Sequence, residues 1–123
     1  MSKTATTIAE VIARVDALKP NVFTDSQKIE WLNKVESTIQ TDILDVPEEE
    51  LIVYTEDDLD RELIVKLPHR DLYDYYLMAM IDYMANDISS YQNTMTMFNS
   101  VYEEAQKALR KKNAVHSRFR NWW

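Results

Sequence analysis

Apolar residues recur at helical spacing in four parts of the chain, a pattern that lines one face of an α-helix. The spacing predicts helices over residues 7–18, 25–42, 70–85 and 88–112. The first two stripes consist of Ile8, Val11, Ile12, Val15 and Leu18, and of Ile29, Leu32, Val35, Ile39 and Ile43. The protein is therefore expected to be mainly α-helical.

Residues that start or end helices stand at the expected boundaries. Thr7 precedes Glu10 by three positions and Thr24 precedes Gln27 by three, which is the spacing of a capping box. Pro20 ends the first helix because proline restricts the residue before it and donates no backbone hydrogen bond. Asn86 is expected to end the third helix in a left-handed conformation, a role that glycine usually fills.

The last two predicted helices differ in how they use their faces. The third is apolar around most of its circumference and leaves Asp71, Asp74, Met78 and Asp82 for a mainly polar side. Such a helix is central to its domain. The fourth repeats apolar residues in steps of three and four, at Tyr91, Met95, Phe98, Tyr102, Ala105 and Leu109. This seam predicts that one face of the fourth helix packs into the core.

Two short β-prone runs lie between the second and third helices. They are "LIVY" at 51–54 and "LIVK" at 63–66, and the acidic "TEDDLDRE" separates them. The pattern predicts a short β-hairpin over about residues 51–66. Two strands alone are marginally stable, so they must lie on the helices or pair with another chain. The predicted fold is a four-helix bundle-like domain over residues 1–112 with this hairpin inserted, followed by an extended tail at 113–123.

The composition excludes several classes of function. The 123 residues include no cysteine and no glycine. Without cysteine there is no disulfide framework, thiolate metal site or thiol nucleophile. Without glycine there is no phosphate-binding loop, dinucleotide fingerprint or nucleophile elbow. No run of apolar residues is long enough for a transmembrane helix, and the N-terminus is not typical of a secretory signal.

Catalytic and metal-binding patterns are equally sparse. The histidines, His69 and His116, belong to no helical metal-binding motif. Asp74 and Asp82 are the best-placed carboxylates for acid–base chemistry, but an ordinary solvated face is the better interpretation. The spacing of the acids around residues 57–60 does not match an EF-hand. We therefore expect a non-enzymatic protein without catalytic residues, metal or cofactor.

The formal net charge of −7 is unevenly distributed. Residues 45–62 hold nine acids and one base, whereas residues 105–123 hold six bases and no acid. A charge run is most often a solvated face. The C-terminal tail also contains aromatic residues, and its candidate anchor residues are Arg118, Phe119, Arg120, Trp122 and Trp123. An anchor into a protein partner is the leading interpretation, because tryptophan and arginine are enriched in interface hot spots. A disordered solubilising end and a nucleic-acid or membrane contact are the alternatives.

The stretch "YQNTMTMFN" at 91–99 is uncharged although it lies in a predicted helix. Its apolar members belong to the core seam, but Asn93 and Thr96 fall on another side. Exposed helices usually carry Glu and Lys, so an amide and hydroxyl face suggests a half-buried surface or one that contacts another subunit. Asn93 and Thr96 are therefore the candidate subunit-interface residues.

Taken together, these elements resemble the small head–tail connector proteins of tailed phages and prophages, also called adaptors or head-completion proteins. The resemblance spans roughly residues 11–110. It depends on "VDALKPNVFTDSQKIEWLNKVESTI", "ELIVKLPH" and "DLYDYYLMAMIDYMANDISSYQNTMTMFNSVYEEAQKAL" in that order.

The resemblance implies a viral structural protein that assembles as a ring under the portal, extends the DNA channel and links head to tail. Its partners would be the portal protein, neighbouring connector or tail proteins and further copies of itself, and DNA would pass through without specific binding. Such a protein is made in the bacterial host cytoplasm and resides in the virion at the head–tail junction, without membrane contact. The alternative is a small cytoplasmic helical regulator that binds a protein or nucleic acid through its basic C-terminal tail.

Overall fold

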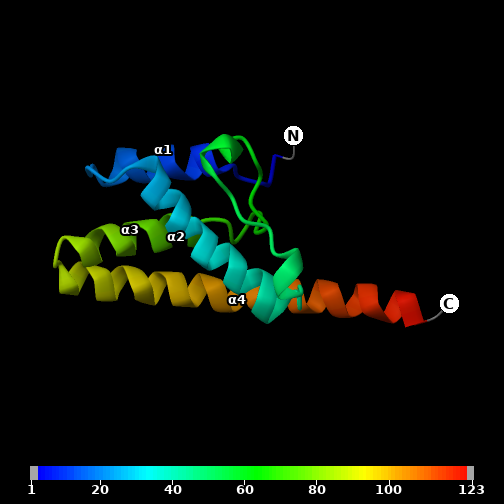
Figure 1. Cartoon of the computed structure of the whole chain (residues 1–123). Coiled ribbons are helices and arrows are strands. Elements are labelled where there is room, and N and C mark those ends of the chain that lie inside the picture. The colour runs from blue at the N-terminus through cyan, green and yellow to red at the C-terminus, as the bar shows by residue number, and fades with distance from the viewer. Residues whose placement is uncertain (1–2, 122–123) are drawn as a thin grey trace.

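A computed structural model describes the backbone of residues 3–121 and the side chains of residues 3–113. Its α-helices are α1 (Ile8–Leu18), α2 (Asp25–Thr38), α3 (Leu72–Met84) and α4 (Ile88–Asn121). The α3 and α4 helices form an antiparallel hairpin, α2 crosses the hairpin at an angle, and α1 packs against α3 (Figure 1). The expected mainly helical, bundle-like fold class is confirmed.

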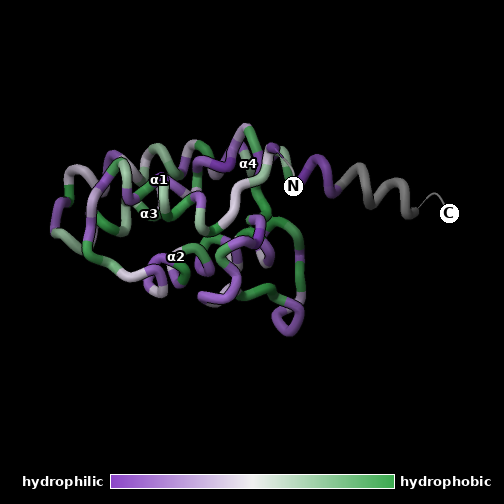
Figure 2. The backbone as a smooth tube through the Cα atoms, turned by 90° about the horizontal axis from the view of Figure 1, so that it is seen from above, coloured by the Kyte–Doolittle hydropathy of each residue, from purple (hydrophilic) through white to green (hydrophobic). Residues whose placement is uncertain are grey.

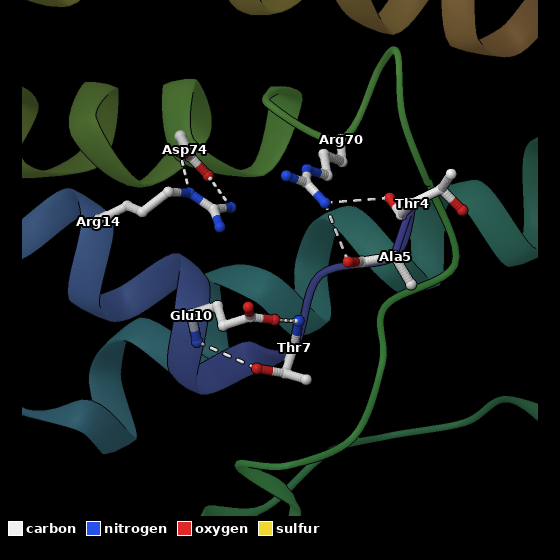
Figure 3. Close-up of polar contacts among 7 residues, drawn as sticks. All are labelled: Thr4, Ala5, Thr7, Glu10, Arg14, Arg70 and Asp74. Atoms are coloured by element: carbon white, nitrogen blue, oxygen red, sulfur yellow. Dashed lines mark hydrogen bonds and ion pairs between the residues drawn. The ribbon is translucent and has the colours of Figure 1, made fainter. Parts of the chain in front are cut away.

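The helix boundaries follow from the predicted caps. Thr7 and Glu10 form the reciprocal capping box: the Glu10 carboxylate accepts from the Thr7 N–H at 2.9 Å and the Thr7 hydroxyl from the Glu10 N–H at 3.2 Å (Figure 3). The Thr24 hydroxyl accepts from the Gln27 N–H at 3.2 Å. Asn86 has a φ of 60° after the end of α3, which is the left-handed conformation expected there.

The core is built from the predicted stripes. α1 contributes Ile8, Val11, Ile12 and Val15, α2 and its extension contribute Ile29, Leu32, Val35, Ile39 and Ile43, and α4 contributes Phe98 and Ala105. Met95, Tyr102 and Leu109 of α4 are half-buried and pack against the same cluster. On α3, Leu72, Tyr73 and Leu77 are fully enclosed, in keeping with a central helix. The last turn of α2 widens into π-helix over Ile39–Ile43, which keeps both of its end residues buried.

The predicted β-hairpin is wrong. Within the described residues the structure contains no strand. After the π-helical turn Ile39–Ile43, the segment that leads to α3 is irregular except for two short 3-10 turns at Glu48–Glu50 and Glu56–Asp58. The two β-prone runs do not pair with each other because each finds another partner. The first, 51–54, lies along α2 and pairs with side chains of that helix.

The second run pairs with the N-terminal segment that leads into α1. The Leu63 N–H donates to the Thr6 carbonyl and the Leu67 N–H to the Thr4 carbonyl, both at 2.9 Å, and Thr7 forms an isolated antiparallel bridge with Glu62. The Arg70 guanidinium reinforces this contact by donating to the Thr4 and Ala5 carbonyls at 3.2 and 3.0 Å (Figure 3). The N-terminal segment thus occupies the place that the first run was expected to take.

The expectation that the chain leaves the helix after Lys112 is also wrong, because α4 continues to Asn121. The sequence contains no proline after Pro68 and no glycine, so nothing in it ends the helix. The apolar seam stops near Leu109 because α4 passes beyond the other elements there, and a helix without a neighbour needs no apolar face (Figures 1 and 2).

Candidate functional site

The exposed surface of α4 is the candidate contact site that the sequence predicts. The helix starts after Asp87, whose carboxylate accepts from the Ser90 N–H at 3.2 Å. Asn93 and Thr96 both lie exposed on α4. The Thr96 hydroxyl donates to the carbonyl of Gln92 at 2.9 Å, a bond within the helix, so it requires no partner from elsewhere in the fold.

A shallow groove lies beside this surface, between α2 and α4. It has a volume of about 270 Å³ and is lined by Lys34, Val35, Thr38, Asp42, Tyr76, Phe98, Asn99, Tyr102 and Gln106. Its floor is aromatic: the Phe98 ring centroid lies 5.2 Å from that of Tyr76 and 5.6 Å from that of Tyr102. Burial raises the pKa of Tyr76 and of Tyr102, so both hydroxyls remain neutral hydrogen-bonding groups at physiological pH.

The turn from α1 into α2 and the turn from α3 into α4 lie at the same end of the molecule (Figure 1). Several exposed apolar residues belong to these turns or flank them. We call this set the bundle-end patch: Leu18, Val22, Tyr83, Met84 and Ile88, each at least half exposed. Asp82, in the last turns of α3, holds this end together: it pairs with the Lys19 ammonium that follows α1 and accepts from the Ser90 hydroxyl of α4 at 2.7 Å. An apolar surface of this kind is a common mark of a protein contact.

The polar side predicted for α3 is not the solvated face that we expected. Asp74 and Asp82 are only 8% and 4% exposed and face α1. The Arg14 guanidinium binds the Asp74 carboxylate through two hydrogen bonds of 2.9 and 3.0 Å, and this carboxylate raises the pKa of Arg14 (Figure 3). Asp74 is thus neutralised by Arg14 of α1 and Asp82 by Lys19, the residue that follows α1. The two ion pairs tie this part of the chain to α3 and leave neither carboxylate free.

A buried carboxylate that the sequence patterns did not single out lies at the centre of the molecule. Glu36 is completely buried and accepts hydrogen bonds from the Tyr54 hydroxyl at 2.8 Å, the Ile64 N–H at 3.1 Å and the Tyr73 hydroxyl. The Tyr73 hydroxyl in turn accepts from the Val65 N–H at 2.9 Å. Its helical position indicates burial, because Glu36 lies four residues after Leu32 and three before Ile39 on the apolar face.

Burial dominates the protonation chemistry of this cluster. It raises the pKa of the Glu36 carboxyl, and the donors Tyr73, Tyr54 and Ile64 oppose that rise. Burial, together with the nearby Glu36, also raises the pKa values of both tyrosines, so both stay protonated donors. All of the polar atoms involved bind one another, so the cluster joins α2, α3 and the segment between them rather than presenting a reactive group.

The remaining candidates give no chemical site among the residues that the structure describes. No group of three or more potential metal ligands comes together in residues 3–113, and His69 is half-buried without such neighbours. No helix in the described part of the chain is long and apolar enough to cross a bilayer. The side chains of His116, Arg118, Phe119 and Arg120, and the whole of Trp122 and Trp123, lie outside the described residues.

Comparisons with known proteins add no family to this picture. The chain matches no family model, no curated protein and no solved structure.

Proposed function

We propose that this protein is a head–tail connector of a tailed phage or prophage, a non-enzymatic subunit that assembles as a ring under the portal and links head to tail. The observation that carries the proposal is the course of α4. This helix packs in the core along its first part and then passes beyond the other elements, with residues 110–113 exposed. Because an isolated helical segment is marginal in water, such a projection favours a partner that covers it.

The distribution of contact surfaces also supports a ring. A ring of identical subunits needs two different surfaces that meet head to tail. The bundle-end patch lies at one end of the molecule and the projecting part of α4 lies at the other (Figure 1). Between them, the uncharged face with Asn93 and Thr96 offers hydrogen-bonding groups without the charge repulsion that identical neighbours would otherwise meet.

The charge of the folded part is suited to a channel that passes DNA without holding it. Residues 1–104 contain 21 acids and eight bases. A protein gains DNA affinity by neutralising phosphates with Lys and Arg, so an excess of carboxylates weakens such contacts. In this proposal the portal protein, the next connector or tail protein and further copies of the chain are the partners, and the virion is the site of function.

Electron microscopy of the protein mixed with portal particles of the phage or prophage whose genome encodes it tests this proposal. Added density as a ring at the portal is the expected result. The double variant Asn93→Glu/Thr96→Glu should reduce that density, because it places negative charge where like subunits meet. Gln27→Glu adds the same kind of charge at an exposed position of α2 and should leave the ring intact.

Two outcomes would contradict the proposal. Portal particles that remain bare at saturating protein would remove the link between head and tail. A tight, salt-dependent complex with DNA or RNA in a gel-shift assay would instead favour the regulator that binds through its basic tail, because the salt slope counts phosphate contacts.

A further inference from the structure

The extended run 51–54 is held by α2 along one edge only. The Gln40 side chain donates from Nε2 to the Ile52 carbonyl at 3.0 Å and accepts at Oε1 from the Ile52 N–H at 2.8 Å. Asn33 makes the same pair of bonds with Tyr54, at 2.9 and 2.8 Å. One side-chain amide of α2 and one of the π-helical turn that continues it thus take the place of a neighbouring strand.

The opposite edge, at Val53, is open. Alternate residues of an extended chain direct their backbone groups to opposite sides, so the N–H and carbonyl of Val53 point away from α2. Within the described residues neither group has a hydrogen-bond partner, and the Leu51 carbonyl on the same edge has none. Val53 is 62% exposed and Ile52 41%. A peptide that adds to such an edge as a strand forms hydrogen bonds with the unpaired backbone groups and packs against the exposed β-branched side chains.

The charge around this edge indicates which strand it accepts. The acidic turns Glu48–Glu50 and Glu56–Asp58 lie immediately before and after the run. The ion pairs among the described residues involve none of these six acids. Antiparallel pairing of two copies around Val53 would bring the first turn of one copy against the second turn of the other. Like-charge repulsion therefore disfavours a second copy and favours a cationic strand.

An acid-lined cavity lies at the C-terminal end of the run and completes the arrangement. It has a volume of about 560 Å³ and is lined by Ser26, Ile29, Glu30, Asn33, Tyr54, Thr55, Glu56 and Asp57. Three of the lining residues are carboxylates, Glu30, Glu56 and Asp57, and all three are exposed to solvent. The cavity lies on the α2 side of the run, opposite the open edge. Glu56 and Asp57 directly follow the run, so a lysine or arginine that lies beyond Tyr54 on an added strand would meet these two carboxylates.

We propose that the edge at Val53 binds an extended basic peptide of a partner protein by strand addition. The backbone of the peptide pairs with Val53 and the Leu51 carbonyl, its apolar centre covers Ile52 and Val53, and a flanking lysine or arginine meets the carboxylates of Glu56 and Asp57. The inference does not depend on ring assembly, because it stands on α2 and residues 48–58 rather than on α4.

The test uses a labelled synthetic peptide with a Val-Thr-Val centre flanked on both sides by lysines, titrated into the full-length protein. Fluorescence anisotropy gives its Kd, and amide NMR follows the Val53 N–H. The matched probe is the same peptide N-methylated on alternate backbone amides, which keeps the charge but removes the donors. We expect binding of the first peptide, a shift of the Val53 amide signal, and about tenfold weaker binding of the methylated peptide.

Variants of the protein sharpen the test. Asp57→Asn removes a carboxylate from the turn that directly follows the run, whereas Asp60→Asn removes one from the same acidic block beyond that turn. Asp57→Asn should weaken binding roughly three- to tenfold, as expected for loss of a charge pair that peptide binding partly desolvates, and Asp60→Asn should have a clearly smaller effect. Val53→Pro removes the open donor without breaking a bond within the described chain and should abolish the complex.

Three results would overturn the proposal. Equal affinity for the methylated and unmethylated peptides, or equal loss in Asp57→Asn and Asp60→Asn, would reduce the interaction to diffuse charge attraction. Absence of binding would show that the acidic residues prevent this edge from pairing with any strand. If Val53→Pro fails to fold, the comparison of the two peptides on the unaltered protein still decides.

Discussion

The runs "LIVY" at 51–54 and "LIVK" at 63–66 share their first three letters in the order Leu-Ile-Val, yet the fold treats them differently. The second run is bonded on both sides: Leu63 to the N-terminal segment, and Ile64 and Val65 to Glu36 and Tyr73. The first run is bonded on one side only, through Ile52 and Tyr54 to side chains of α2. Ile64 and Val65 are half-buried and buried, whereas Ile52 and Val53 are exposed.

This difference shows what β-propensity leaves open. β-branched residues favour an extended chain, but the backbone groups of that chain then need partners, and the partners need not be strands. Here an amide, a carboxylate and a phenol supply them. The inner run becomes part of the core network, and the outer run retains a free edge. The predictions below test how firmly each run is held.

The inner run should depend most strongly on Glu36. Glu36→Ala leaves two buried tyrosine hydroxyls and the Ile64 N–H without their acceptor, so we expect the free energy of unfolding to fall by about 3–5 kcal/mol. Urea denaturation measures this loss. Glu30→Ala removes an exposed carboxylate from the same helix and should change stability by less than about 0.5 kcal/mol. Equal effects of the two substitutions would contradict the central role of Glu36.

A proline placed in each run compares the two directly. Ile64→Pro removes the N–H that donates to Glu36 and should cost about 2–3 kcal/mol of unfolding free energy. Val53→Pro removes an N–H that has no partner within the described chain and should cost less than about 0.5 kcal/mol. Thermal and urea unfolding of the pair give the comparison. A larger loss in the Val53 variant would show that the outer edge is engaged within the fold.

The outer run should depend on Gln40 less strongly than the inner run depends on Glu36. Gln40→Ala removes both bonds to Ile52, but Ile52 is 41% exposed and water replaces part of the loss. We expect about 1–2 kcal/mol and faster hydrogen exchange at the Ile52 amide. Thr41→Ala, at an exposed neighbour whose hydroxyl bonds only within its own helix and to Asp42, should leave that exchange rate unchanged. Unchanged exchange in Gln40→Ala would mean that the amide does not hold the run.

The smallest effect is a pH dependence that distinguishes Glu36 from surface acids. Because burial raises the pKa of Glu36 in the folded state above its ordinary value of 4.5, the folded state holds the proton more strongly than the unfolded state. The stability that Glu36 contributes therefore falls as pH rises from 4.5 to the folded-state pKa, and is constant above it.

Glu36→Gln resembles the protonated side chain and should lack this dependence. Urea midpoints of both proteins across the acid range measure the difference, and the native protein should lose stability relative to the variant as pH rises through this window. Glu10 provides the internal contrast, because its hydrogen bond from Thr7 lowers its pKa and its contribution is lost as pH falls. A native protein that gains on the variant with rising pH would show that the hydrogen bonds outweigh burial.

Much of the helical framework was predictable because it depends on local signals. Residues such as Ile8, Leu32 and Phe98 occupy the predicted faces, and Thr7, Thr24 and Asn86 start and end helices as expected. The hairpin was not predictable in its true form, because the competition between a strand and the amide of Gln40 is a tertiary contact. The helical course of residues 113–121 differs from the predicted extended tail, because a helix that extends past its neighbours can continue without apolar periodicity.

The candidate surfaces divide in the same way. Exposure of Asn93 and Thr96 follows from helical periodicity alone, and the structure agrees with it. The neutralisation of Asp74 and Asp82 depends on where Arg14 of α1 and Lys19, just after it, come to lie, which no local pattern encodes. The open edge at Val53 is likewise a result of chain path. Sequence alone therefore located the helical surface but neither the polar clusters nor the free backbone.

The π-helical turn at Ile39–Ile43 has a consequence for how this chain tolerates changes of length. A π-turn is what an α-helix becomes when it accommodates one additional residue without unwinding. Removing Thr41, which is exposed in that turn, would restore regular winding and keep the residues on both sides facing the same way. Deletion of one residue within Asp25–Thr38 would rotate the following part of the helix by roughly 100° about its axis. The side chains after the deletion would then no longer face the core. We therefore expect deletion of Thr41 to destabilise the fold less than deletion of a residue within α2. This tolerant position is adjacent to Gln40, whose side chain holds the outer run.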